Sequence, residues 1–354
     1  MLTKLELICP DCRDALTYVH SKNLLCARCK TSYELLEDIP ILTRNTKYYG
    51  DFNESEMDQL LKDLDNSSWE EVIYQWTKDN PWLRTIISDQ TRSDFVNLLD
   101  VTQNSLVLDI GSGWGNSAIG TAKSTGASVI ALDGTWHRLR FVQKRAAQEK
   151  VSTLDFVCAN VLKLPFREEV FDFAIMSGVL EWVGTSVEKG DPSELQEQAL
   201  SEVCRVLKPT GQLLIGIENS HGFKYLLGAP DDHTGIKHIT YLSRDAANKK
   251  MQSIRGCDYR TYTYTMDGYS QLLKRAGFNY CDFFYPIPDY KTCSYIIPLR
   301  DTRALRFFLH HIDAEKPKAS MQQEIRIREM QAIDDGTIGN RVSSYFIVAH
   351  KMHM

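Results

Sequence analysis

Three glycines follow a short apolar run that contains an acid, in the stretch "LVLDIGSGWGNSAIG". The run predicts a buried strand, and the glycines predict a turn that leads into a helix. Their spacing is GxGxG, whereas the dinucleotide fingerprint is GxGxxG, and no Gly-Lys-Ser/Thr follows as in a P-loop. The acid stands two residues before the first glycine, where it would repel a pyrophosphate. We therefore predict a positively charged ligand without phosphate, held by Asp109, Gly111, Ser112, Gly113 and Gly115.

Two further polar side chains follow the next two predicted strands. Asp133 ends the strand 128–133, where an acid can accept hydrogen bonds from both hydroxyls of a ribose. Asn160 follows the strand in "LDFVCAN", where a side-chain amide can bond an adenine edge. Amino-acid, ribose and adenine contacts at three successive strand ends form the arrangement that binds S-adenosylmethionine, and Val161 and Ser177 complete the predicted site. The structural alternatives are that Asp133 caps a helix and that Asn160 is a turn residue.

Strands and helices alternate from residue 105 onward. The five strands that begin this pattern lie in "LVLDI", "SVIALD", "LDFVCAN", "FDFAIMSG" and "GQLLIGIE", with helices at 136–150 and 194–207. Two more strands are expected in "FNYCDFFYPIP" and "SYFIVAHK". This alternation predicts an α/β fold with a doubly wound, mostly parallel, seven-stranded sheet.

Four of the nine cysteines form two CxxC pairs near the N-terminus: Cys9 with Cys12, and Cys26 with Cys29. Each pair can point two thiolates at one ion, and four sulfurs are the tetrahedral set that structural zinc prefers. A segment this small buries little core, so a metal would supply the missing stability. Redox pairs or a disulfide are the alternatives. Redox CxxC pairs usually lie on a βα unit, which the pattern around them does not predict.

Residues 105–215 resemble the class I S-adenosylmethionine-dependent methyltransferases, in the group related to ubiquinone and menaquinone methyltransferases. The resemblance rests on "VLDIGSGWG", "VIALDG", "ANVLKLPF", "FDFAIMSGVLEWV" and "LSEVCRVLKPTGQLLIGIE", in this order. It implies a Rossmann-like fold and S-adenosylmethionine as methyl donor. The chain departs from the group at Asn160, where an acid is usual, and at Trp182, where His is frequent. The N-terminal segment is similar to a zinc-binding segment fused to some bacterial methyltransferases, and to a small activator protein of translation-related methyltransferases.

These patterns predict three parts. Residues 1–43 form a zinc-ribbon-like module, 44–104 a helical linker or lid, and 105–354 the methyltransferase domain. Insertions at about 219–262 and 286–340 follow the fifth and sixth strands. Inserted loops on a common scaffold usually carry the specificity of binding, so we expect substrate choice to reside there.

The first insertion contains "DDH", in which a carboxylate stands beside an imidazole. A His held by a carboxylate is a suitable general base for a hydroxyl acceptor, so we predict His233 as the base with Asp232 as its partner. Glu181, in "SGVLEWVG", is the alternative base, and Glu218 is expected to shape the pocket. In the structural alternative, His233 caps a helix or lies in a solvated loop.

The composition of the chain limits the kinds of partner that we expect it to bind. The formal net charge is -5, and no apolar run approaches the roughly 20 residues that span a membrane. No secretory signal is visible, so a cytoplasmic location is expected. The insertions are similar to those of methyltransferases from bacterial surface-glycan or secondary-metabolite gene clusters. We expect a small-molecule acceptor, methylated at a hydroxyl or amine of a sugar, glycan precursor or metabolite. The alternatives are an RNA methyltransferase, which the acidic balance disfavours, and a non-catalytic sensor that docks a protein through the zinc module.

Overall fold

The computed structural model describes residues 6–19, 22–43, 50–311 and 320–351. Parts of the predicted segments 1–43, 44–104 and 286–340 therefore lie outside the described residues. The chain divides into two compact units, which are described separately below. Unit 1 comprises Met1–Ser177, Gln198–Leu214 and His350–Met354, and unit 2 comprises Gly178–Glu197 and Ile215–Ala349. This division cuts across the predicted domain 105–354.

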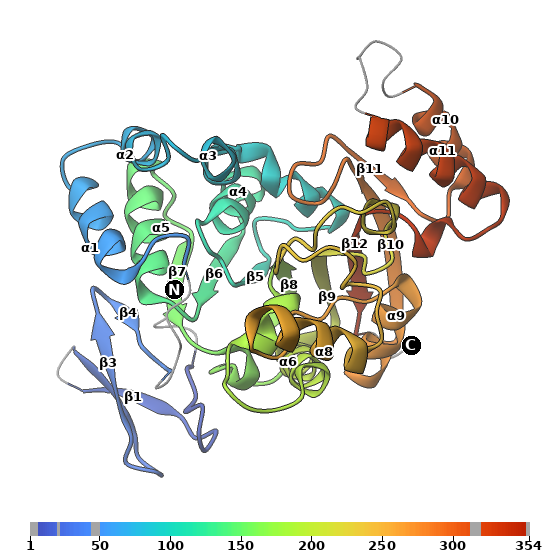
Figure 1. Cartoon of the computed structure of the whole chain (residues 1–354). Coiled ribbons are helices and arrows are strands. Elements are labelled where there is room, and N and C mark those ends of the chain that lie inside the picture. The colour runs from blue at the N-terminus through green and yellow to red at the C-terminus, as the bar shows by residue number, and fades with distance from the viewer. Residues whose placement is uncertain (1–5, 20–21, 44–49, 312–319, 352–354) are drawn as a thin grey trace. The chain divides into compact units, whose positions relative to one another are not determined.

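Unit 1 is built on four parallel strands, which appear in Figure 1. They are β5 (Leu106–Ile110), β6 (Ser128–Asp133), β7 (Leu154–Cys158) and β8 (Phe171–Ser177), in the order β8-β5-β6-β7. The paired strands β5/β6, β5/β8 and β6/β7 all run parallel. These strands are apolar along most of their length and largely buried, as strands covered on both faces must be. The predicted doubly wound sheet is therefore confirmed for these strands.

A long strand, β9 (Leu207–Glu218), begins in unit 1 and ends in unit 2. At its start the Val170 amide donates to the Val206 carbonyl, and at its end the Gly178 amide donates to the Gly216 carbonyl. Because both partners advance together along the chain, β8 and β9 run parallel. Glu218 therefore stands at the carboxyl end of its strand, as Ser177 does.

Helices α4 (Asn116–Thr125) and α5 (Trp136–Gln148) connect the strands of unit 1, and α6 (Pro192–Val206) precedes β9. A short 3-10 turn, η3 (Val161–Lys163), follows β7. Upstream lie α1 (Glu54–Asp63), α2 (Trp69–Trp76) and α3 (Pro81–Ser88). Capping boxes start α1 and α2, because Asn53 and Ser68 each cap the third helical residue. The segment Gln90–Leu98, predicted as helix, is the 3-10 helix η2.

The N-terminal module forms a small antiparallel sheet, β1-β2-β3-β4. Its strands are β1 (Leu16–Val19), β2 (Asn23–Cys26), β3 (Ser32–Leu36) and β4 (Ile39–Pro40), and β1 pairs antiparallel with β2 between the two CxxC pairs. The chain beyond β4 then extends the main sheet. Ile41 forms a parallel bridge with Cys158, and the Leu42 amide donates to the Cys158 carbonyl at 2.7 Å. This pairing covers the open edge of β7.

In unit 2 the end of β9 belongs to the strand order β11-β10-β12-β9. The strands are β10 (Tyr280–Ile287), β11 (Tyr295–Pro298) and β12 (Ser344–His350). Among the described residues the large sheet has eight strands, one more than the predicted seven. The additional strand, β11, lies in the predicted insertion 286–340 and pairs antiparallel with β10.

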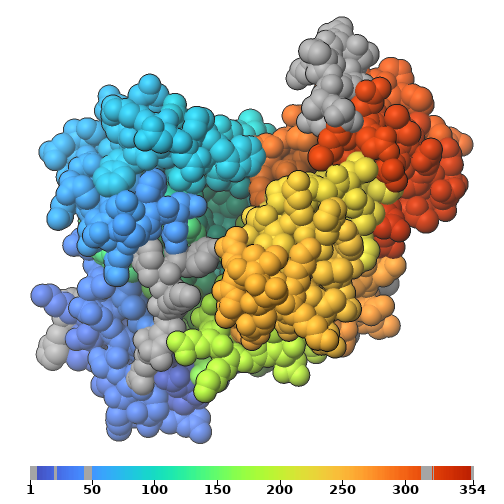
Figure 2. Space-filling model, viewed as in Figure 1, coloured from blue at the N-terminus to red at the C-terminus, as the bar shows by residue number. Residues whose placement is uncertain are grey.

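The helices of unit 2 come mainly from the two insertions. After β8 comes η4 (Leu180–Thr185), and after β9 come α7 (Phe223–Leu226) and α8 (Arg244–Arg255). The remaining helices are α9 (Met266–Arg275), α10 (Thr302–His311), α11 (Ser320–Asp334) and η5 (Ile338–Asn340). Yellow surface in Figure 2 marks much of the first insertion. Ile239, Met251 and Tyr259 give this insertion a core of its own, so it is a folded part of unit 2.

A buried arginine on α5 ties the upstream helices to the start of α4. Arg145 is 1% exposed, and its Nη1 donates to the carbonyls of Ile87 and Trp114 at 3.3 and 3.1 Å. Its Nε donates to Glu149 at 2.8 Å, and its guanidinium lies 3.9 Å from the ring centre of Trp69. The buried charge is therefore fully partnered, as its burial requires.

We expect Arg145→Ala to lower the free energy of unfolding by about 3–5 kcal/mol, because it leaves Glu149 and two carbonyls without their buried partner. Arg140→Ala on the same helix is the control, since Arg140 forms a more exposed pair with Glu37, and it should cost less than about 1 kcal/mol. Urea unfolding curves measure both. Equal losses in the two variants would contradict this account of Arg145.

Candidate functional site

The glycine turn after β5 depends on backbone angles that other residues rarely adopt. Gly111, Gly113 and Gly115 have φ angles of 68°, 52° and 86°. A Cβ atom at Gly115 would also lie 2.7 Å from Cγ1 of Val142 on α5. The third glycine thus allows α4 to begin close against α5.

Asp133, at the end of β6, holds this turn in place. Its Oδ2 accepts from the Gly113 amide at 3.0 Å, and its Oδ1 accepts from the Thr135 amide at 2.9 Å. Ser112 adds a hydrogen bond from its hydroxyl to the Asp109 carbonyl at 3.0 Å. Each carboxylate oxygen retains a further lone pair. The predicted bonds from Asp133 to a ribose are therefore compatible with its contact to the turn.

Asp109 lies on β5 with 2% of its surface exposed. Within the described parts of the chain, its Oδ2 is buried and has no hydrogen-bond partner. Burial raises the pKa of this carboxyl to about 7; the nearby charge of Asp133 acts in the same direction, while Ser112 opposes it. A buried carboxylate with an unpaired oxygen attracts a cationic group, which is the ligand chemistry predicted for this turn.

The other predicted cofactor residues follow β7 and β8. Asn160 Oδ1 accepts from the Leu162 amide at 2.9 Å and caps η3, so the structural alternative for Asn160 is realised. Val161 is buried in the same turn, and Ser177 is half-buried at the end of β8. The NH₂ group of Asn160 and the second lone pair of its oxygen can still contact an adenine.

Residues just before α1 also contact the glycine turn. Trp114 Nε1 donates to Asp51 at 2.8 Å, and Arg138 donates to the same oxygen at 3.1 Å. The rings of Phe52 and Trp114 meet edge to face at 5.9 Å. Asp51 was not predicted as a site residue, because it stands 63 residues before its partner and belongs to no motif.

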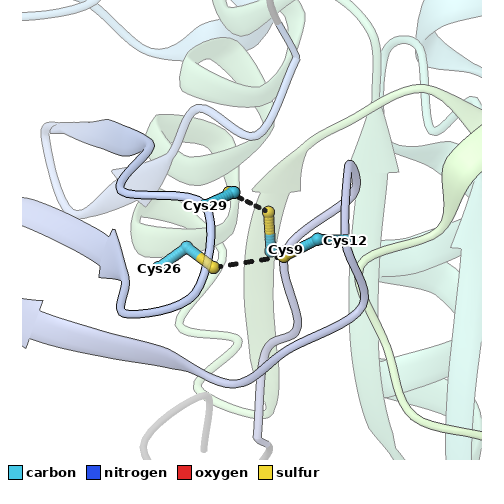
Figure 3. A group of neighbouring side chains, drawn as sticks. All are labelled: Cys9, Cys12, Cys26 and Cys29. Atoms are coloured by element: carbon cyan, nitrogen blue, oxygen red, sulfur yellow. Dashed lines mark hydrogen bonds between the residues drawn. The ribbon is translucent and has the colours of Figure 1, made fainter.

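The four predicted zinc ligands converge, as Figure 3 shows. The sulfurs of Cys9 and Cys29 are 3.6 Å apart, and those of Cys12 and Cys26 are 3.3 Å apart. Sulfurs around one tetrahedral zinc lie about 3.8 Å apart, given Zn–S bonds of about 2.3 Å. The thiols are not joined as disulfides. This donor set fits the predicted zinc and offers no support for a disulfide.

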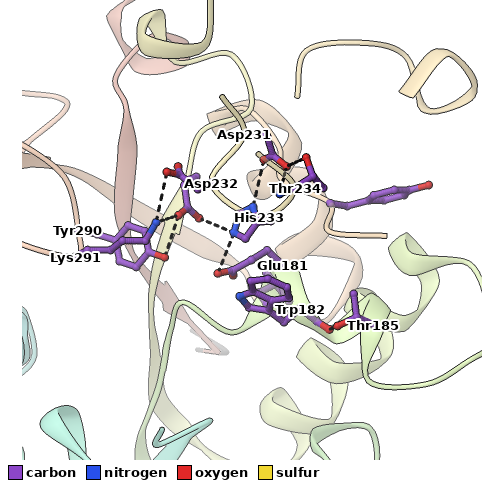
Figure 4. Close-up of polar contacts among 12 residues, drawn as sticks. Glu181, Trp182, Thr185, Asp231, Asp232, His233, Thr234, Tyr290 and Lys291 are labelled. Carbon is purple, nitrogen blue, oxygen red and sulfur yellow. Dashed lines mark hydrogen bonds and ion pairs between the residues drawn. The ribbon is translucent and has the colours of Figure 1, made fainter. Parts of the chain in front are cut away.

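A second group of titratable side chains lies in unit 2 (Figure 4). Glu181 comes from η4, Glu218 from the end of β9 and His233 from the first insertion. Both glutamates are 1% exposed, and the His233 side chain is 3% exposed. His233 Nε2 is 3.6 Å from Glu181 Oε1 and 3.6 Å from Glu218 Oε2. The ring of Trp182 meets the imidazole edge to face at 5.0 Å.

The structure changes the carboxylate partner predicted for His233. The contact to its Nδ1 comes from Asp231 Oδ1 at 3.3 Å, and Asp231 is itself held by the amide and hydroxyl of Thr234. Asp232 accepts instead from Lys224 at 2.7 Å and from Tyr225. Neighbouring side chains of a tight loop need not point the same way. The sequence places both acids beside His233 but does not distinguish between them.

The charges around His233 also change its predicted role. Burial by itself lowers the pKa of His233, but the contact to Asp231 and the charges of Glu181 and Glu218 outweigh it and raise this pKa to about 10. These contacts favour the protonated imidazole, which argues against the predicted role of His233 as the general base. Burial raises the pKa of Glu181, and the Glu218 charge adds to this shift.

Two residues of the second insertion complete the group without having been predicted. Lys291 Nζ lies 2.5 Å from Glu218 Oε1, and the Tyr290 hydroxyl donates to the same oxygen at 3.2 Å. Although burial opposes it, the charge of Lys291 lowers the pKa of Glu218. Lys291 is 73 residues from Glu218, and only the Tyr- and Pro-rich composition around it marks the segment.

The chain matches known proteins over its central part. A family model described as "Methyltransferase domain" matches residues 108–215. An uncharacterized protein of Haemophilus influenzae is 28% identical over 187 residues, which are 52% of this chain and 62% of that protein. The demethylmenaquinone methyltransferase of Shouchella clausii is 28% identical over 125 residues, which are 35% of this chain and 49% of the relative.

Among solved structures, phosphoethanolamine N-methyltransferase 2 of Haemonchus contortus has 16% identity and a TM-score of 0.46, and the match covers 83% of this chain and 60% of that one. The chain thus spans about half to three-fifths of the length of the relatives it matches. The family match covers the strands and the glycine turn that carried the resemblance predicted from the sequence, and it confirms that resemblance. Over these residues the chain carries a class I S-adenosylmethionine-dependent methyltransferase domain.

Proposed function

We propose that the protein transfers the methyl group of S-adenosylmethionine to a hydroxyl or amine of a small molecule, such as a sugar, a glycan precursor or a secondary metabolite. The main support for this proposal is the environment of the Glu181 carboxylate. Glu181 stands four residues after Ser177, its carboxylate is buried, and neither of its oxygens has a hydrogen-bond partner among the described residues. Such a carboxylate can accept a hydrogen bond from the O–H or N–H group of the molecule that is to be methylated.

Residues of unit 1 supply the cofactor contacts in this proposal. Asp109 attracts the cationic amino-acid part, Asp133 accepts from the ribose, and Asn160 bonds the adenine edge. The glycine turn lets the backbone approach closely. When bound, S-adenosylmethionine supplies a methyl group that is already activated by its sulfonium, so the protein mainly positions the acceptor and removes its proton.

Residues of unit 2 bind the acceptor. With S-adenosylmethionine bound, the acceptor would take up the activated methyl group, and the Glu181 carboxylate would accept the acceptor proton. His233, held by Asp231, lies between the two glutamates. Asp232 orients Lys224 and Lys291 at the edge of the group.

Two observations favour a small molecule over RNA. The group in unit 2 is rich in carboxylates, which would repel the phosphates that dominate nucleic-acid binding. By its name, the relative from Shouchella clausii methylates demethylmenaquinone, a small molecule.

No helix in the described ranges is long and apolar enough to cross a membrane. The cytoplasmic location and a docking partner for the cysteine module remain predictions.

The function is tested with S-adenosylmethionine that carries a tritiated methyl group. The protein is incubated separately with the small-molecule, RNA and protein fractions of its source cells. We expect label in the small-molecule fraction, and label confined to RNA would overturn the proposal.

The same assay tests the role of Glu181. Glu181→Gln keeps the shape of the side chain but cannot take a proton, so labelling should slow by about 100-fold or more, while cofactor affinity measured by calorimetry stays unchanged. Glu197→Gln, an exposed acid paired with Arg275, serves as the control. Full activity in Glu181→Gln would show that another group accepts the proton.

Cofactor affinity should depend on pH through Asp109. Its pKa is raised to about 7, so the carboxylate is ionised above that pH and becomes neutral below it. We expect the affinity for S-adenosylmethionine to rise roughly tenfold from pH 5.5 to pH 7, measured by calorimetry. Asp109→Asn should bind weakly at both values, with the pH dependence removed. A variant that keeps the same pH dependence would assign it to another group.

We also propose that Cys9, Cys12, Cys26 and Cys29 hold one structural zinc ion. Metal analysis should find about one zinc per chain fewer in Cys9→Ser than in the unaltered protein. The melting temperature of the variant should fall, since the metal replaces the core that this module lacks. Cys257→Ser, at an exposed cysteine outside the module, should change neither quantity. Equal zinc contents in Cys9→Ser and the unaltered protein would rule out zinc binding by the four cysteines.

A further inference from the structure

Three carboxylate oxygens in unit 2 are buried without hydrogen bonds. They are both oxygens of Glu181 and Oε2 of Glu218, and no partner for them exists in the part of the chain that the structure describes. Buried polar groups in proteins are almost always hydrogen-bonded or bound to a metal. These oxygens therefore point to a bound group that the protein chain itself does not provide.

The same oxygens converge on one nitrogen. His233 Nε2 lies 3.6 Å from an oxygen of each glutamate, and one ligand atom from each of the three residues lies within 4.8 Å of the others. A distance of 3.6 Å is too long for a hydrogen bond. Ligand atoms at about 2.1 Å from one tetrahedral ion are about 3.4 Å apart, so the observed spacing fits a shared cation.

The surroundings orient these atoms as the outer shell of a metal site does. Asp231 contacts His233 Nδ1 at 3.3 Å, which directs Nε2 toward the two glutamates. A carboxylate on the second nitrogen is the usual support of a metal-binding histidine. Lys291 and Tyr290 bind Glu218 through Oε1, so Oε2 faces His233.

The charge of the group also matches a divalent cation. When the imidazole is neutral, as a metal ligand must be, four carboxylates face two ammonium groups. These groups together carry an excess of negative charge, which a divalent ion would offset. The carboxylates are Glu181, Glu218, Asp231 and Asp232, and the ammonium groups are Lys224 and Lys291.

We propose that Glu181, Glu218 and His233 bind a divalent metal cation, through two carboxylate oxygens and one imidazole nitrogen. This donor set contains no sulfur and suits Mn²⁺, Co²⁺ or Zn²⁺. Three protein ligands leave a coordination position open, as in metal sites that also bind a substrate oxygen. The site is independent of the cysteine site and does not rest on the proposed methyl transfer.

The test is a titration of the full chain with Mn²⁺ alone. The electron paramagnetic resonance signal of free Mn²⁺ measures how much of the ion is bound. Mn²⁺ prefers oxygen and nitrogen donors, so the cysteines compete weakly for it. We expect one Mn²⁺ to bind per chain. Glu181→Gln should weaken binding by at least tenfold, and Asp231→Asn by roughly 10- to 100-fold.

Glu329→Gln is the matched control, because Glu329 is also a buried acid of unit 2 but hydrogen-bonds to Tyr285. Its affinity for Mn²⁺ should equal that of the unaltered protein. Circular dichroism checks that each variant folds, and Glu218→Gln replaces Glu181→Gln if the latter does not. Absence of binding at millimolar Mn²⁺, or equal affinity in the control and the glutamate variant, would overturn the proposal. Neither cofactor nor acceptor is present, so failed methyl transfer leaves this result unaffected.

Discussion

Burial of charge is the constraint on which both candidate sites depend. A charged group out of water must find partners, because the loss of its hydration is large. Arg145 meets this requirement within the chain, with carbonyls, a carboxylate and an indole ring around its guanidinium. Asp109 and Glu181 are buried as deeply, and yet Asp109 Oδ2 and both oxygens of Glu181 lack hydrogen-bond partners among the described residues. Arg145 is therefore a structural charge, whereas the two carboxylates are suited to bind a ligand.

The elements that carry the predicted cofactor residues could be predicted because these residues are local to regular elements. Asp109, the glycines and Asp133 follow strands whose apolar runs are distinct, and each lies within a few residues of a strand end. What the pattern does not reveal is how these residues contact one another. That Asp133 holds the Gly113 amide depends on the pairing of β5 with β6. The structural alternative for Asn160 could not be excluded without the geometry of its turn.

The unit 2 group was predicted only in part, for a physical reason. Glu181 and His233 stand beside recognisable features, a strand end and the "DDH" triplet. Lys291 and Asp231 could not be selected from the sequence, since one reaches its partner across 73 residues and the other depends on side-chain directions within a loop. The mutual effect of buried charges is also invisible in a sequence. For that reason His233 was predicted as a base, whereas the charges of its neighbours raise its pKa.

The conformation of the glycine turn is not determined by the matched residues 108–215 alone. Trp114, inside the turn, donates to Asp51, and its carbonyl accepts from the same guanidinium that binds the Ile87 carbonyl. Both partners lie upstream of the family match. A change at Asp51 or in the helices that precede β5 can therefore alter the glycine turn without changing any residue of the matched domain.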